Sequence, residues 1–138
     1  MIGLDANVLA RYYVDDKADA QAQRQRLAAQ RLIESGQALM VCKPVILELE
    51  WVLRGYYGFS PGDVGAVFRH LLAMPHVTVE HRDAVVQALS SAEAGIDFAD
   101  ALHHASYRTC ASVASFDDRK FARRAKKLGL APAIVLLS

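Results

Sequence analysis

The sequence has few cysteines and no long apolar run, and both absences exclude classes of protein. Two cysteines, Cys42 and Cys110, are too few for a disulfide framework. Each lies in or beside an apolar run, so we expect small core residues in a reducing compartment. No apolar run approaches the ~20 residues of a membrane-spanning helix, and the opening MIGLDANVLA lacks the basic region of a signal peptide. We therefore expect a cytoplasmic protein without a membrane segment.

The sequence also lacks a charge excess, internal repeats and linkers. Its net charge is +1, so nucleic acid could be bound only through a local basic patch. A chain of 138 residues, 53% of them hydrophobic, can bury roughly two-thirds of its unfolded surface without a disulfide or structural metal. We expect one domain that comprises residues 1–138.

Short apolar runs alternate with longer helical patterns along the chain. The expected strands cover residues 2–4, 39–42, 77–79, 112–114 and 133–137. The expected helices cover residues 7–13, 18–35, 44–54, 61–73, 82–93, 98–108 and 119–128. This alternation predicts an α/β fold with three layers, α/β/α, around a central, mainly parallel sheet of four to five strands. In such sheets, sites form where strands end and helices begin.

Several acidic residues occupy such positions, and each alone has an ordinary structural explanation. Asp5 follows the first expected strand and is a suitable helix N-cap. Asp97 and Asp100 open a helix with the spacing of a capping box. Asp117 stands between a strand and a helix, where either it or Asp118 can be the cap.

Glu48 is harder to explain as a structural residue. Its helix neighbours at −3, +3 and +4 are Val45, Trp51 and Val52, whereas Glu50 points roughly 200° away. We therefore expect Glu48 on or beside an apolar face, where an unpaired carboxylate is costly. A role in a site is at least as good an explanation as a satisfied core acid.

Parallel topology can gather Asp5, Glu48, Asp100 and Asp117 at one edge of the sheet. Carboxylates at such short range repel one another unless a cation neutralises them. Oxygen ligands suit Mg²⁺ or Mn²⁺, and no Cys/His spacing indicates zinc. Such sites most often act on phosphate esters, because the metal activates water and stabilises the charge of the transition state.

Four segments of the chain resemble, in order and at fitting intervals, the four motifs of the PIN-domain family. They are LDANVLARYY, PVILELEWVLR, DFADALHHA and SFDDRKFARRAKKLG, and the best match is to the toxins of VapBC-type toxin–antitoxin pairs. By position, the family's four acids fall on Asp5, Glu48, Asp100 and Asp117. Supporting positions fall on Asn7, Asp97, Ser115 and Asp118. The chain departs from the pattern at Ala6, where threonine is usual, and at Asp118, which supplies a second acid beside Asp117.

This resemblance implies a metal-dependent endoribonuclease, the toxin of a type II toxin–antitoxin pair. Mg²⁺ or Mn²⁺ would be held mainly by Asp5, Asp100 and Asp117, with Glu48 as a ligand or a water-positioning base. Water activated by the metal would hydrolyse RNA to leave a 5′-phosphate and a 3′-hydroxyl. The resemblance also implies a homodimer and a cognate antitoxin whose tail fills the active-site groove.

Other polar and aromatic features fit more than one explanation. Basic residues crowd the last expected helix, opposite an apolar stripe of Phe121, Ala125 and Leu128. They are Arg119, Lys120, Arg123, Arg124, Lys126 and Lys127. They can form a solvated face that complements the helix C-terminus, or a track for the RNA backbone. We expect His103 and His104 to be partly exposed helix residues and not metal ligands.

An aromatic cluster follows the expected helix over residues 44–54. It consists of Trp51, Tyr56, Tyr57 and Phe59. Core packing is the better explanation of Trp51, whereas some tyrosines could line a dimer or antitoxin groove.

Competing functions differ in the acids that they require. A receiver domain needs an acidic pair after the first strand, whereas Asp5 stands there alone. A haloacid-dehalogenase-type phosphatase needs Asp-x-Asp at this point, and here Asn7 occupies the position of the second aspartate. Two alternatives stay open: a non-catalytic PIN-fold module that binds RNA or protein, and a DNA-directed nuclease. All four matched acidic positions are filled, which favours an enzyme.

Overall fold

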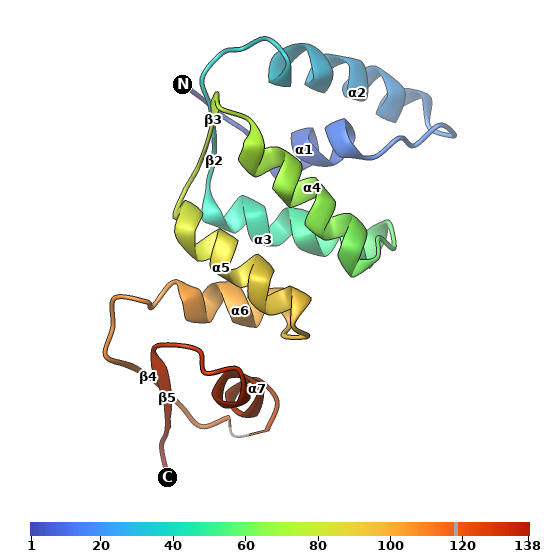
Figure 1. Ribbon diagram of the computed structural model, residues 1–138. Coiled ribbons are helices and arrows are strands. Elements are labelled where there is room, and N and C mark those ends of the chain that lie inside the picture. Colours follow the sequence, from blue (N-terminus) through green and yellow to red (C-terminus); the bar gives the residue numbers. More distant parts are fainter. Residues whose placement is uncertain (118) are drawn as a thin grey trace. The chain divides into compact units, whose positions relative to one another are not determined.

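The computed structural model describes residues 1–117 and 119–138, in which helices alternate with short parallel strands (Figure 1). The predicted α/β class and the parallel pairing are confirmed. The contacts divide the chain into two compact units, Met1–Arg82 and Asp83–Ser138, here called unit 1 and unit 2. Of the helices in the described residues, none has the length and apolar content to cross a membrane.

Unit 1 contains a parallel three-stranded sheet with the strand order β1-β2-β3. The strands are β1 (Ile2–Gly3), β2 (Leu39–Val41) and β3 (Val77–Val79). Parallel strands cannot be joined by a tight turn, so helices form both connections. Leu39 of the central strand aligns with Ile2 on one side and with Val77 on the other. The carboxyl ends of the three strands therefore lie at one edge of this sheet.

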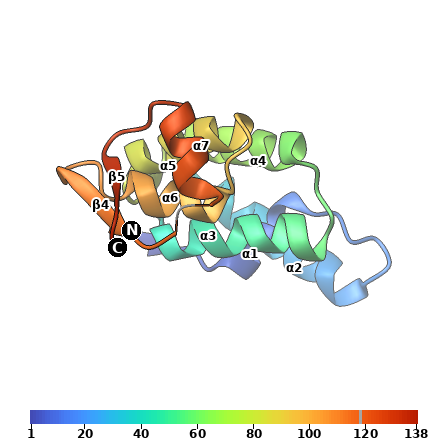
Figure 2. The same ribbon diagram turned by 90° about the horizontal axis from the view of Figure 1, so that it is seen from below.

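Four α-helices surround a closely packed core in unit 1. They are α1 (Ala6–Tyr13), α2 (Ala20–Ile33), α3 (Lys43–Trp51) and α4 (Pro61–Ala73). Helix α1 packs against α2 and α3, as both views show (Figure 1 and Figure 2). The core includes Leu9, Ile33, Leu49 and Phe68, whose side chains are fully buried.

Local signals explain where several helices begin and end. Ser60 caps α4 by accepting a hydrogen bond at Oγ from the Asp63 N–H at 3.1 Å, and Pro61 holds the first helical position. Asp19 caps α2 by accepting from the N–H groups of Gln21 and Ala22. Gly36, which follows the end of α2, has a φ of 82°, a left-handed conformation that favours glycine.

The helix predicted to end near Arg54 continues instead as a π-helical segment, η1 (Val52–Tyr56). Trp51, which precedes it, is 59% exposed, so the prediction that Trp51 packs in the core is wrong. The wider π turn lets the side chain lie against Gly55, where an added Cβ would be 3.5 Å from the indole ring. Tyr56 is exposed as well, and its ring meets that of Tyr57 edge-on at 4.8 Å.

Unit 2 contains three helices and a parallel pair of strands in its described residues. They are α5 (Arg82–Glu93, of which Arg82 is the last residue of unit 1), α6 (Phe98–Ala105), β4 (Ser112–Ser115), α7 (Phe121–Lys127) and β5 (Ala133–Leu136). Strand β4 pairs with β5, with Ser112 opposite Ala133. The described strands thus form sheets of three and two strands, where one sheet of four to five strands was expected.

Candidate functional site

Asp5 lies at the carboxyl end of β1 and caps α1. Its Oδ1 accepts a hydrogen bond from the Ala6 N–H at 2.7 Å, and its backbone is extended. The buried Leu4 before it donates its N–H to Met40 O of β2, which fixes the chain at this point. The side chains of Asp5 and the nearby Asn7 are exposed. Asp5 is therefore a helix cap whose carboxylate stays open to solvent.

The two glutamates of α3 are placed opposite to the prediction. Glu48 is exposed, whereas Glu50 is 6% exposed and accepts a hydrogen bond at Oε1 from Arg54 Nε at 2.7 Å. The prediction that Glu48 lies on or beside an apolar face is thus wrong. The helix has apolar residues on both sides, and fully buried Ile46 and Leu53 flank Glu50 at −4 and +3. A structural role in the core belongs to Glu50, and Glu48 is a solvent-facing carboxylate.

Sequence reasoning gave no role to a further acid of unit 1, Glu80, which directly follows β3. Its Oε1 accepts a hydrogen bond from the Lys43 N–H at 2.8 Å, which caps the first turn of α3 from a neighbouring strand. Lys43 Nζ lies 2.9 Å from Nδ1 of His81, a residue with a φ of 50°. The sequence signal that could have identified Glu80 is the one that identified Asp5, namely an acidic residue directly after an apolar strand. Glu80 supports the edge of the sheet at which Asp5 also lies.

In unit 2, Asp97 and Asp117 each lie within electrostatic range of Asp100. Desolvation raises the pKa of Asp100, the carboxylates of Asp97 and Asp117 raise it further, and His103 opposes them. Asp97 caps α6 by accepting at Oδ1 from the Asp100 N–H at 3.0 Å, as the predicted capping box requires. Repulsion among these carboxylates is the electrostatic signature expected of a cation site.

Asp117 is held in a turn directly after β4. Its N–H donates to Ser115 Oγ at 3.0 Å, and its Oδ1 accepts from the Arg119 N–H at 3.0 Å. Ser115 therefore orients Asp117, in keeping with its predicted supporting position. Asp118, the other candidate for the fourth acid, lies outside the described residues.

The donor chemistry of these residues fits a hard divalent cation. Carboxylate oxygens are the ligands that Mg²⁺ and Mn²⁺ prefer, and a cation would relieve the repulsion at Asp100. Asp5 and Glu48 belong to unit 1, and Asp100 and Asp117 belong to unit 2, so the predicted set is divided between the units. Among the described residues, no three His, Cys, Asp or Glu side chains form a ready-made metal site.

The two histidines of α6 differ from each other. His103 is exposed and meets the Tyr107 ring edge-on at 5.2 Å. His104 is 4% exposed, and its Nε2 donates to Pro132 O at 2.7 Å. The expectation of two partly exposed histidines is therefore wrong for His104, which joins α6 to the segment before β5.

The basic residues of α7 and the turn before it face solvent, as predicted. The exposed ones are Arg119, Lys120, Arg123, Arg124, Lys126 and Lys127. Arg124 Nη1 donates to Gly95 O at 2.6 Å, so this guanidinium also has a structural contact. In the predicted apolar stripe, Ala125 is buried and Phe121 is half-buried, but Leu128 is 43% exposed.

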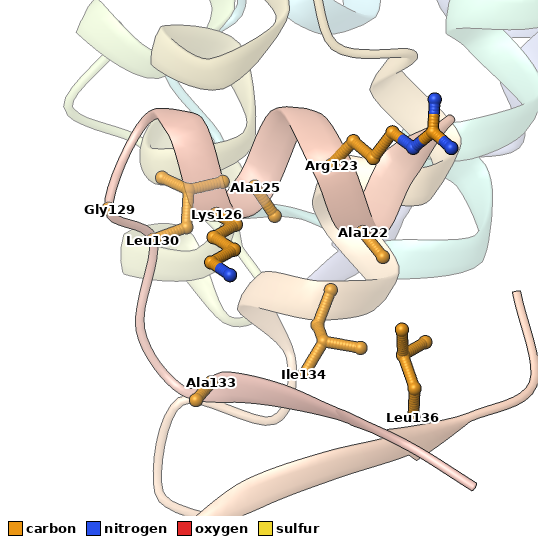
Figure 3. A pocket seen from close by; sticks show the side chains of 9 residues that line it. All are labelled: Ala122, Arg123, Ala125, Lys126, Gly129, Leu130, Ala133, Ile134 and Leu136. Atoms are coloured by element: carbon orange, nitrogen blue, oxygen red, sulfur yellow. The ribbon is translucent and has the colours of Figure 1, made fainter. Parts of the chain in front are cut away.

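A pocket of about 710 Å³ lies between α7 and β5 within unit 2 (Figure 3). Its lining is mainly apolar and includes Ala125, Leu130 and Ile134. The ammonium group of Lys126 lies between helix and strand, and the Arg123 side chain extends away from β5 (Figure 3). Within the part of the chain that the structure describes, none of the predicted acids lines this pocket.

The sequence of the chain matches that of a known domain family. The PIN domain family matches residues 2–127, a span that includes Asp5, Glu48, Asp100 and Asp117 and runs through both units. No curated protein sequence matches the chain. The matched span covers far more than half of the 138 residues. The chain therefore belongs to the PIN-domain family, whose members are generally metal-dependent nucleases.

Proposed function

We propose that this protein is a metal-dependent endoribonuclease, the toxin of a type II toxin–antitoxin pair. The observation that carries the proposal is at Asp100 in unit 2, whose pKa is raised by desolvation and further by the carboxylates of Asp97 and Asp117. A cation bound near Asp100 would offset the repulsion between these carboxylates. Membership of the PIN-domain family supports such a cation site.

Asp5, Asp100 and Asp117 would hold Mg²⁺ or Mn²⁺, and Glu48 would be a further ligand or a base. When bound, the cation supplies Lewis acidity and stabilises the negative charge of the phosphoryl transition state. The exposed carboxylate of Glu48 can accept a proton from the water that attacks phosphorus. The cap bond at Asp5 fixes one carboxylate in orientation, and the turn formed by Ser115, Asp117 and Arg119 fixes that of Asp117, which does not cap α7.

The exposed basic residues near Asp117 would position the RNA backbone. Candidates are Arg119, Lys120, Arg123 and Lys127, and Arg124 contributes less because it also bonds Gly95 O. RNA is preferred to DNA on the resemblance to toxin ribonucleases. The same resemblance supports a homodimer, a cognate antitoxin, a cytoplasmic location and a single domain over residues 1–138.

The test is cleavage of a mixed RNA pool in Mn²⁺ and in EDTA by wild type and Asp100→Asn. The matched control is Asp83→Asn, an exposed acid of unit 2 whose carboxylate only pairs with Arg108. We expect Mn²⁺-dependent cleavage by wild type and the control, and none by Asp100→Asn. Equal cleavage by Asp100→Asn would overturn the assignment of this acid. Cleavage of single-stranded DNA in preference to RNA would instead identify a DNA-directed nuclease.

Thermal unfolding with Mn²⁺ separates a binding module from an enzyme with a narrow substrate. Metal at a hundredfold excess over its Kd stabilises the folded state by about 2.7 kcal/mol. For a chain of this size, that corresponds to a rise in Tm of roughly 8–13 °C. A rise that is absent in Asp100→Asn supports a metal site even where no RNA in the pool is cut. No rise in wild type, together with no cleavage, would indicate a non-catalytic PIN-fold module.

A further inference from the structure

An open hollow of about 460 Å³ lies in unit 1 among α1, α2 and α4, and the proposed hydrolysis does not use it. Its lining combines aromatic rings with charged and amide groups. The polar and aromatic lining residues are Tyr12, Tyr13, Arg26, Gln30, Glu34 and His70. The four acids of the proposed metal site are not among the residues that line it.

The aromatic part of the hollow is held in place by hydrogen bonds. The Tyr12 and Tyr13 rings meet edge-on with centroids 4.9 Å apart, and the Tyr13 ring meets His70 at 5.5 Å. Tyr13 Oη lies 2.9 Å from His70 Nδ1, and Tyr12 Oη donates to Glu34 Oε1 at 3.1 Å. Burial raises the pKa of Tyr13 strongly, so its hydroxyl stays protonated. The rings therefore offer a preformed aromatic surface.

The polar part comes from one face of α2 and the residue that ends it. Arg26, Gln30 and Glu34 are spaced four apart, which aligns their side chains along the helix. The Arg26 guanidinium is oriented by a salt bridge from Nη1 to Asp15 Oδ1 at 2.9 Å. Glu34 accepts one hydrogen bond from Tyr12, and a carboxylate has about four acceptor sites. A cation, an amide and an anion thus follow one another beside the aromatic surface.

This arrangement selects a class of ligand. An aliphatic ligand would make no use of the remaining hydrogen-bonding capacity of Arg26 and Glu34, and a phosphate alone would be repelled by the Glu34 carboxylate. A planar heterocycle with polar edges can contact the rings while it pairs with the polar row. Guanine fits best, because its O6 and N7 accept from an arginine and its N1–H and N2–H groups donate to a carboxylate. The other bases lack one of these two complementary edges.

We propose that this hollow is a nucleobase subsite that binds a guanine of single-stranded RNA. The choice of RNA rests on the proposed ribonuclease function, whereas the base itself is inferred from Tyr12, Arg26 and Glu34. Such a subsite would give the enzyme a sequence preference at a position separate from the hydrolysed bond.

The experiment is a titration of GMP, AMP, CMP and UMP, followed by NMR shifts of the protein in EDTA. EDTA removes any metal contribution, and no cleavage is needed for the readout. We expect GMP to bind most tightly to wild type. Arg26→Ala and Glu34→Gln should each weaken GMP binding by about 5- to 150-fold, since one paired base edge is worth that much. Arg24→Ala is the matched control, because Arg24 is an exposed arginine of α2 outside the hollow, and it should bind like wild type.

A second arm distinguishes RNA from a free nucleotide. Two short single-stranded RNAs are identical except at one position, which is G in one and A in the other. The affinity of each RNA for wild type and for Glu34→Gln is measured in EDTA. A preference for G in wild type that is lost in Glu34→Gln supports the proposal. Equal affinity for the four nucleotides, unchanged GMP binding in both variants, or free GMP binding without a preference in RNA would each overturn it. Failure of the Mn²⁺ cleavage assay would contradict the proposed function alone.

Discussion

The two glutamates of α3 provide a direct test of the structure, because exchanging each for alanine should have opposite consequences. Glu48 is exposed, and Glu50 is 6% exposed and bonds Arg54 at 2.7 Å. Both stand on the same helix two residues apart, so Glu48→Ala and Glu50→Ala change helix propensity equally. We expect Glu50→Ala to lower stability and keep cleavage, and Glu48→Ala to keep stability and lose cleavage.

The magnitude for Glu50→Ala follows from its surroundings. Its hydrogen bond to a charged group is worth about 1.5 kcal/mol, at the low end of the range because the Arg54 side chain is 49% exposed. Alanine keeps the Cβ, so one buried methylene is lost, which contributes about 0.8 kcal/mol. Removing a buried carboxylate recovers part of its desolvation cost, which leaves a net loss of about 1–2 kcal/mol. For this chain length, Tm should fall by roughly 3–10 °C.

The assay compares thermal unfolding and Mn²⁺-dependent RNA cleavage for wild type and both variants. Glu48→Ala, a surface change, should stay within about 0.5 kcal/mol of wild type in unfolding free energy. The reasoning is refuted if Glu48→Ala is the destabilised variant and Glu50→Ala unfolds like wild type. It is also refuted if Glu50→Ala abolishes cleavage at a temperature where it is fully folded.

Three further predictions follow from single residues. Asp5→Asn should reduce cleavage by more than about 100-fold, because the loss of even an outer partner of a metal ligand costs about 10- to 100-fold in activity. The variant should unfold like wild type, since asparagine can also cap α1 by accepting from the Ala6 N–H. A large loss of Tm would contradict this prediction. In EDTA, Asp100→Asn should stabilise the folded state by less than about 1 kcal/mol at pH 7. The raised pKa of Asp100 means that the wild type loses stability as pH rises through that pKa, so the gain should vanish on acidification in pH-dependent unfolding. Phe68→Ala should cost about 3–5 kcal/mol in denaturant unfolding, because the ring is fully buried in unit 1, and a loss below about 1 kcal/mol would show that the core can collapse there.

The sequence alone predicts most helices and strands, because their signals are local. The strand Val77–Val79 and the helix Arg82–Glu93 have the bounds that periodicity predicted. Ser60 and Pro61 begin α4 as their cap and first-turn preferences require. These features depend on neighbours a few residues apart, which are visible in a sequence.

Features that depend on distant contacts could not be predicted in this way. Helix α3 is apolar on both sides, so the neighbours of Glu48 at −3, +3 and +4 did not decide whether Glu48 or Glu50 is buried. The continuation of α3 into η1 depends on where the Trp51 ring lies. The division of the described strands between two sheets is likewise decided by pairing across the chain.

The capping role of the acids does not compete with the proposed role in metal binding. The printed sequence allowed either explanation for Asp5, Asp97 and Asp117, and in the structure each accepts a backbone N–H at Oδ1. One such bond occupies a single lone pair of a group that has about four acceptor sites. The same bond fixes the carboxylate plane, which is how outer contacts orient metal ligands. Because a strand-to-helix junction supplies both unpaired N–H groups and an exposed edge, an acid there can accept a backbone N–H and keep its other acceptor sites open to a cation.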